Sequence, residues 1–198
     1  MTHKPNRRMK KYISVIFLVA GMWTTSASGS EPYVNAFVGK TVMNHVGRGH
    51  KDSGLTMLGA IGLGFENNCR IEAEVGYQAV GNNGEYGSTI DSDMPVLSIL
   101  VNAYYDISFF DIATPYITAG VGETNVYPMG ITIPDALQTS KTSLAYQLGT
   151  GITVPIGDNV KVDARYRYFV TPKVILDPAF DNQKLSSSSF LLGLRFNL

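Results

Sequence analysis

The side chains best suited to chemistry are two histidines in one polar segment. His45 and His50 lie close to Arg48, Lys51 and Asp52. Imidazole nitrogens bind metals and transfer protons, so a metal or catalytic site is one interpretation. The other is an exposed loop, since no acid besides Asp52 and no cysteine lies at ligand spacing. We expect the loop, and with it no catalytic residue, no metal and no cofactor.

A second set of reactive side chains occupies every other position in several segments. Between residues 160 and 168, ionic side chains alternate with Val, Ala or Tyr. Residues 70–77 alternate Arg and Glu with apolar side chains, and Arg195 lies on the polar side of the last segment. Side chains of a β-strand alternate between its two faces. Each segment is therefore predicted to be a strand with one apolar face and one polar face.

Period-two alternation recurs along the chain in eight segments. They are residues 32–42, 55–66, 69–80, 94–107, 114–123, 142–154, 159–170 and 187–198. The intervening segments alternate strictly between short and long. The short ones are 67–68, 108–113 and 155–158, and the long ones are 43–54, 81–93, 124–141 and 171–186. This pattern is typical of an all-β, eight-stranded, antiparallel up-and-down transmembrane β-barrel with four long external loops.

In such a barrel the polar faces must point into the lumen, because lipid surrounds the outside. Arginines and carboxylates that share a narrow lumen can neutralise one another, as buried charges require. We therefore hypothesise an internal charge network that plugs the barrel. Its members are Arg70, Glu72, Glu74, Lys161, Asp163, Arg165, Arg167 and Arg195.

The first 29 residues have the layout of a secretory signal peptide. Basic residues are followed by a short apolar run and then by a tail of small residues that ends near Gly29. We expect cleavage there, leaving residues 30–198 as one barrel domain in a bacterial outer membrane. Removing the five bases of this segment from 16 leaves 11 bases against 16 acids, a net charge of −5. No basic patch suggests nucleic acid, and a single cysteine, Cys69, excludes an internal disulfide.

Three of the strand segments, 97–106, 114–122 and 144–151, together with 165–169 and 193–196, resemble a known family. They are similar to the opacity-protein-like, OmpA-like eight-stranded outer-membrane β-barrel surface antigens, including the rickettsial barrel adhesins. The resemblance covers the strands from about residue 94 to the end and is absent from the loops. It implies a surface antigen, an adhesin or a small structural barrel, embedded in outer-membrane lipid, with host-surface proteins as partners of the loops.

The last strand also resembles the assembly signal that the barrel-insertion machinery reads. Gly193, Phe196 and Leu198 match that signal, whereas Leu191 stands where a polar residue is usual. The resemblance therefore implies the insertion machinery as a partner. The candidate contacts for an external partner lie elsewhere, in two loops. They are His45, His50, Tyr127, Met129 and Ile131, the last three in an unusually apolar loop.

Two other functions stay open from the sequence. A lipid A-modifying barrel enzyme needs a His and a Ser on the barrel wall, and no His lies on a predicted strand. A soluble lipocalin-like ligand binder would place its apolar face inside. The three hypotheses differ in where the apolar faces point and in whether the histidines act on lipid A.

Overall fold

Eight β-strands make up nearly all of the chain that the structure describes. The computed structural model describes residues 30–45, 51–81, 94–108, 112–126, 141–174 and 183–198. The strands are β1 (Ser30–His45), β2 (Lys51–Phe65), β3 (Cys69–Gly81), β4 (Met94–Asp106), β5 (Thr114–Val126), β6 (Lys141–Pro155), β7 (Val160–Val174) and β8 (Gln183–Asn197). Within these residues, no helix has the length and apolarity needed to cross a membrane.

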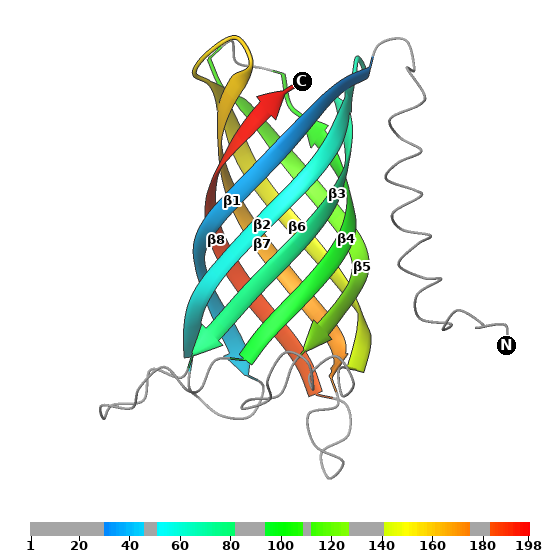
Figure 1. The fold of residues 1–198 in the computed structure, drawn as a ribbon, viewed down its shortest axis with the longest axis vertical. Helices are drawn as coiled ribbons and strands as arrows, with labels where there is room; N and C mark the ends of the chain where they lie inside the picture. Colours follow the sequence, from blue (N-terminus) through cyan, green and yellow to red (C-terminus); the bar gives the residue numbers. More distant parts are fainter. Residues whose placement is uncertain (1–29, 46–50, 82–93, 109–111, 127–140, 175–182) are drawn as a thin grey trace, which may run out of the picture. The chain divides into compact units, whose positions relative to one another are not determined.

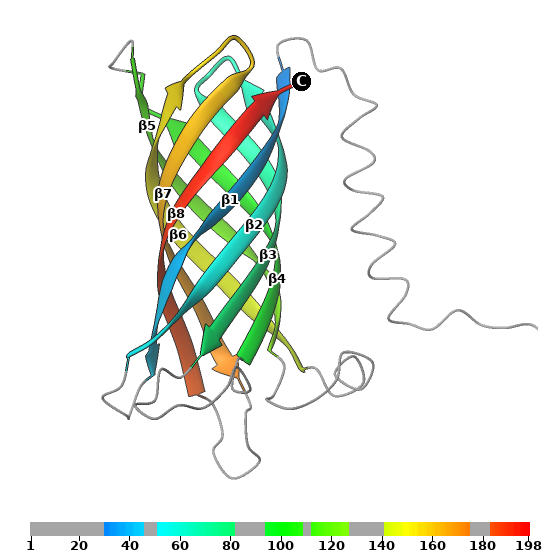
Figure 2. The same ribbon diagram turned by 60° about the vertical axis from the view of Figure 1, so that its left-hand side comes forward.

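The eight strands close into an antiparallel barrel, which confirms the predicted fold. Each strand pairs with the next along the chain, and β8 returns to β1 (Figures 1 and 2). The closing pair runs in continuous register from Tyr33 opposite Asn197 to His45 opposite Leu185. Because the sheet closes on itself, no strand is left with an unpaired edge.

The two faces of the barrel wall have the polarity of a membrane protein. Outward side chains are apolar and exposed, as for Val75 at 57% and Leu192 at 59%. Inward side chains include Glu74 at 0% and Arg165 at 3% exposure. A soluble lipocalin-like binder needs the opposite arrangement, so this polarity argues against that alternative.

Several strands continue into segments predicted to be loops. β1 reaches His45 and β2 begins at Lys51, so only residues 46–50 separate them instead of the predicted 43–54. The connection at 107–113 on the other rim is longer than 46–50, and the predicted strict alternation of short and long connections was therefore wrong there. The physical reason is that backbone pairing continues beyond the segments in which successive side chains alternate between apolar and polar.

The two-residue turn at 67–68 is joined by hydrogen bonds to the end of β4 and to Ser108. Asn68 has a positive φ of 63°, a conformation that asparagine tolerates better than most residues. Its carbonyl accepts from the Asp106 amide at 2.8 Å, and its side-chain oxygen accepts from the Ser108 hydroxyl at 3.2 Å. These contacts fix the end of the barrel where the lumen charges begin.

Candidate functional site: the charge network in the lumen

Strands β3, β7 and β8 carry most of the ionic side chains inside the barrel. Because alternate residues of a strand share a face, β3 and β7 each present a row of charges to the lumen. Seven of the eight charged residues singled out in the sequence are buried, with at most 4% of each exposed. They are Arg70, Glu72, Glu74, Asp163, Arg165, Arg167 and Arg195. Lys161, at the end of the β7 row, is only partly buried, and no ion pair joins it to another described residue.

Glu74 is the centre of the network. Its carboxylate lies 3.0 Å from Nη1 of Arg165 and 3.7 Å from Nη2 of Arg167. It also accepts hydrogen bonds from the amides of Asn102 at 3.2 Å and Gln147 at 3.3 Å. Donors on β4, β6 and β7 therefore converge on one carboxylate from β3, as a buried charge requires.

The two amides also hold each other and the second arginine in place. Nε2 of Gln147 donates to Oδ1 of Asn102 at 2.6 Å, and Oε1 of Gln147 accepts from Nε of Arg167. The guanidinium of Arg167 also lies over the ring of Phe169, 4.5 Å from its centroid. Each polar end of Gln147 thus has a partner, which fixes the orientation of its amide.

Glu72 occupies the next position toward the short-turn rim. It accepts from the hydroxyl of Tyr104 at 2.5 Å, the hydroxyl of Tyr33 at 3.2 Å and the amide of Asn35 at 2.9 Å. Nη2 of Arg165 lies 3.7 Å from it. Arg165 therefore bridges the two glutamates and links β7 to β3 across the barrel.

Asp163 gathers a separate set of donors on the β7 side of the lumen. The Tyr116 hydroxyl donates to it at 2.6 Å, Nη2 of Arg195 at 3.1 Å and the Thr153 hydroxyl at 3.4 Å. Since Arg165 also donates to the Tyr116 hydroxyl at 3.2 Å, this group is continuous with the glutamates.

Arg70 closes the network at the short-turn end. Its guanidinium makes a two-point contact with Asp106, through Nε at 2.8 Å and Nη2 at 2.7 Å. It also lies over three tyrosine rings, with centroids 4.4 Å away for Tyr104, 5.1 Å for Tyr116 and 5.7 Å for Tyr33. Planar guanidinium groups suit both kinds of contact.

The charges of this network balance. Four arginines (70, 165, 167 and 195) face four carboxylates, those of Glu72, Glu74, Asp106 and Asp163. Asp106 was not among the residues expected in the network, nor were the tyrosines and amides that satisfy the carboxylates. They lie on the inward face of their strands, at every second position counted from the inward residues already identified. This spacing is the signal that could have identified them.

A layer of apolar side chains lies inside the barrel toward the longer connections. This cluster of six buried side chains, called the apolar layer below, consists of Met43, Val96, Leu100, Ala145, Phe169 and Leu185. A smaller cluster is formed by Phe37, Leu58 and Leu191. The charge network was predicted from the sequence, but these apolar clusters were not.

The other predicted site residues lie apart from the lumen network. Gly193 faces inward opposite Phe37, whereas Phe196 and Leu198 are exposed, at 40% and 69%. His45 is the last residue of β1, and its side chain lies outside the described part of the chain. The remaining candidate contacts lie outside the described residues altogether: His50, Tyr127, Met129 and Ile131. Among the described residues, no three His, Cys, Asp or Glu side chains are grouped to hold a metal ion.

Comparison with known proteins places this architecture in a family. Residues 13–197 match the family model described as the outer membrane protein beta-barrel domain. The chain belongs to that family. It is therefore an outer-membrane β-barrel protein, and the predicted location in the outer membrane is confirmed.

Individual relatives are similar over most of the barrel. Outer membrane protein PagN of Salmonella typhimurium is 25% identical, with 95% of this chain and 99% of that protein covered. A Rickettsia massiliae protein named "Putative adhesin" is 25% identical over 70% of this chain and 73% of its own. The crystal structure of Neisserial surface protein A superposes with a TM-score of 0.67, at 20% identity, and covers 86% of this chain and all of that one. That likeness supports the same fold.

Proposed function

We propose that this outer-membrane barrel is a non-enzymatic surface protein whose lumen is plugged by its own side chains and whose long external loops bind partners outside the cell. The observation that carries the plug is the balanced network of four arginines and four carboxylates described above. Each of these carboxylates already accepts from neighbouring donors, so none is left as a free general base. The apolar layer supports the same proposal, because its six side chains fill part of the lumen toward the longer connections.

Conductance tests the plug directly. The mature chain is reconstituted in planar lipid bilayers beside an open porin as a positive control. We expect no steady channel, because the lumen of an eight-stranded barrel is just wide enough for side chains to fill. A large and stable single-channel conductance would overturn the plug.

Adhesion is the proposed role of the loops. Its support is the name of the Rickettsia massiliae relative, "Putative adhesin", and the apolar composition of the segment that contains Tyr127, Met129 and Ile131. In outer-membrane barrels the longer connections lie on the extracellular side of the membrane. These residues, with His45 and His50, are therefore the candidate contacts to host-surface proteins.

Surface display tests this role. The chain is expressed in a non-adherent bacterium, and bacteria bound to cultured host cells are counted. Deleting residues 127–133 is expected to abolish the gain in binding, whereas altering residues 156–158 on the opposite rim is not. If the intact chain gives no gain, or the deletion leaves the gain unchanged, adhesion through this loop is wrong.

Delivery to the membrane completes the proposal. Residues 1–29 act as a cleaved signal peptide, and the insertion machinery recognises Gly193, Phe196 and Leu198. Mass measurement of the mature protein is expected to give a chain that starts near residue 30. Phe196→Ser is expected to reduce the assembled fraction in outer membranes, whereas Asn197→Ser is not, and equal assembly of the two variants would contradict the assignment.

A further inference from the structure

Among the side chains that the structure describes, two charged ones are exposed on the outer surface of the strands. Lys40 on β1 and Glu123 on β5 both face outward, in the half of the barrel nearer the longer connections. A lysine on the lipid face costs about 2–4 kcal/mol at the bilayer centre and little near the interface. Lys40 is therefore expected to lie at the level of the lipid headgroups, where its ammonium meets phosphate.

Lys40 begins a row of outward side chains that crosses three strands. It lies opposite Phe190 on β8, and Phe190 lies opposite Tyr166 on β7. The two aromatic rings pack with their centroids 5.1 Å apart at an interplanar angle of 54°. Because cross-strand neighbours on one face lie about 5 Å apart, the cation and the two rings form one continuous ridge.

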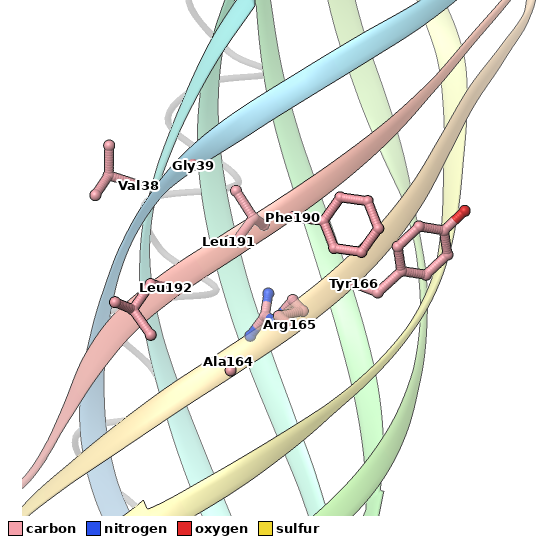
Figure 3. A pocket seen from close by; sticks show the side chains of 8 residues that line it. All are labelled: Val38, Gly39, Ala164, Arg165, Tyr166, Phe190, Leu191 and Leu192. Atoms are coloured by element: carbon pink, nitrogen blue, oxygen red, sulfur yellow. The ribbon is translucent and has the colours of Figure 1, made fainter.

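A second row lies on the same face, two residues nearer the short-turn rim. Val38 on β1 is opposite Leu192 on β8, and Leu192 is opposite Ala164 on β7. Between the two rows the wall is hollowed into a shallow trough of about 410 Å³. Figure 3 shows the Phe190 and Tyr166 rings on one side of the trough and Leu192 and Val38 on the other.

The composition of the trough suits a hydrocarbon chain. Its outward side chains are aliphatic or aromatic, and two small residues, Gly39 and Ala164, give it depth. Arg165 and Leu191, which belong to the inward rows of β7 and β8, line its floor. A Cβ at Gly39 would collide with the β8 backbone at Phe190 and Leu191, so the closeness of the two strands depends on this glycine.

Two hydroxyl groups lie on the same outward face, on β7 and β8. The Tyr166 hydroxyl and the Ser188 hydroxyl are 3.1 Å apart on the exposed face. Ser188 lies two residues beyond Phe190 along β8, toward the longer connections. An ammonium group and two hydroxyls on one patch above an apolar trough are complementary to a phosphate that carries acyl chains.

We propose that the outward face of β7, β8 and β1 binds one molecule of lipid A, with an acyl chain in the trough and a phosphate at Lys40. The long connections of outer-membrane barrels face the exterior, so this end of the trough opens to the outer leaflet, where lipid A resides. The site lies on the outer face of the barrel wall, and it does not depend on adhesion by the loops.

Native mass spectrometry of the full mature chain in detergent micelles tests the site. The protein is titrated with lipid A and, in a parallel series, with phosphatidylglycerol. We expect one bound lipid A, and about tenfold weaker binding for Lys40→Gln, as for the loss of one charge-assisted hydrogen bond. Ala164→Phe, which fills the trough, is expected to weaken binding by a similar factor.

Matched controls come from the other side of the barrel. Glu123→Gln removes the other outward charge among the described side chains, and Ala119→Phe enlarges an exposed alanine on β5. Both are expected to bind lipid A as the unaltered chain does, and heat-dependent gel migration verifies that every variant is folded. Equal binding by Lys40→Gln and the unaltered chain, equal losses in the control variants, or equal affinity for phosphatidylglycerol would each overturn the proposal.

Discussion

Replacing Glu74 by glutamine tests whether the lumen charges are held by mutual neutralisation. The substitution keeps the shape of the side chain and removes its charge, so Arg167 loses the one carboxylate within 4 Å that it has among the described residues. Arg165 keeps Glu72 at 3.7 Å. Breaking a buried ion pair by removing one partner costs about 3–5 kcal/mol. We expect Glu74→Gln to lower the free energy of unfolding by that amount.

The assay is urea unfolding of the barrel in lipid vesicles, followed by gel migration of folded and unfolded chains. Lys161→Gln is the matched control on the β7 row, and it is expected to change the free energy of unfolding by less than about 0.5 kcal/mol. The decisive variant adds Arg167→Met to Glu74→Gln, which restores the balance of charge in the lumen. We expect the double variant to recover more than half of the loss.

Two results would refute this reasoning. One is a loss below about 1 kcal/mol for Glu74→Gln, the range of an ordinary neutral hydrogen bond. The other is a double variant whose loss equals the sum of the two single losses, since additivity would mean that the two side chains are not coupled.

Three further predictions follow from contacts in the barrel wall and lumen. Gly39→Val is expected to reduce the folded fraction on heat-modified gels severely, because its side chain meets the β8 backbone, whereas Gly59→Ala, with open space around it, leaves that fraction unchanged. Leu100→Ala removes part of the apolar layer and is expected to cost about 2–5 kcal/mol in urea unfolding and to admit a small ion leak in planar bilayers. Ile99→Ala, which faces outward, is its control and should leave conductance at the level of the unaltered chain. Tyr104→Phe removes a donor from a buried carboxylate and is expected to cost about 1–3 kcal/mol in the same unfolding assay, and an unchanged midpoint would contradict the 2.5 Å hydrogen bond.

The strands were predictable because membrane insertion imposes a strict alternation on them. Segments such as 69–80 and 159–170 were found within a few residues of their true ends at the short-turn rim. At the other rim the ends of β3, β4 and β6 were also found within one residue, whereas β1, β2, β5, β7 and β8 extend three or four residues beyond their predicted ends. They do so because a ladder that extends beyond the lipid needs no apolar outward face. β8 illustrates this, since it begins at Gln183 and continues through a run of serines with no alternating polarity.

The charged side chains of the lumen could be predicted from their charge and their alternate positions along a strand. The neutral side chains that hydrogen-bond to them could not. Arg165 and Glu74 stand out in the sequence as charges on alternating segments. Tyr104 and Gln147 do not, because the same residue types also suit an interface belt or a neutral wall. The apolar layer was missed for a related reason: Leu100 on an inward face looks like an exception until the closed sheet brings Phe169 and Val96 beside it.

The pairing of the first strand with the last has a consequence for biogenesis. Tyr33 on β1 and Arg165 on β7 both contact Glu72. The set of groups that contact Glu72 is therefore complete only when the final hairpin, β7 and β8, has joined the barrel. Until that hairpin pairs, the Glu72 carboxylate lacks the arginine that neutralises part of its charge. Closure of the barrel and completion of the contacts around Glu72 are therefore expected to occur together. Both require the last strands, so they follow synthesis of the whole chain.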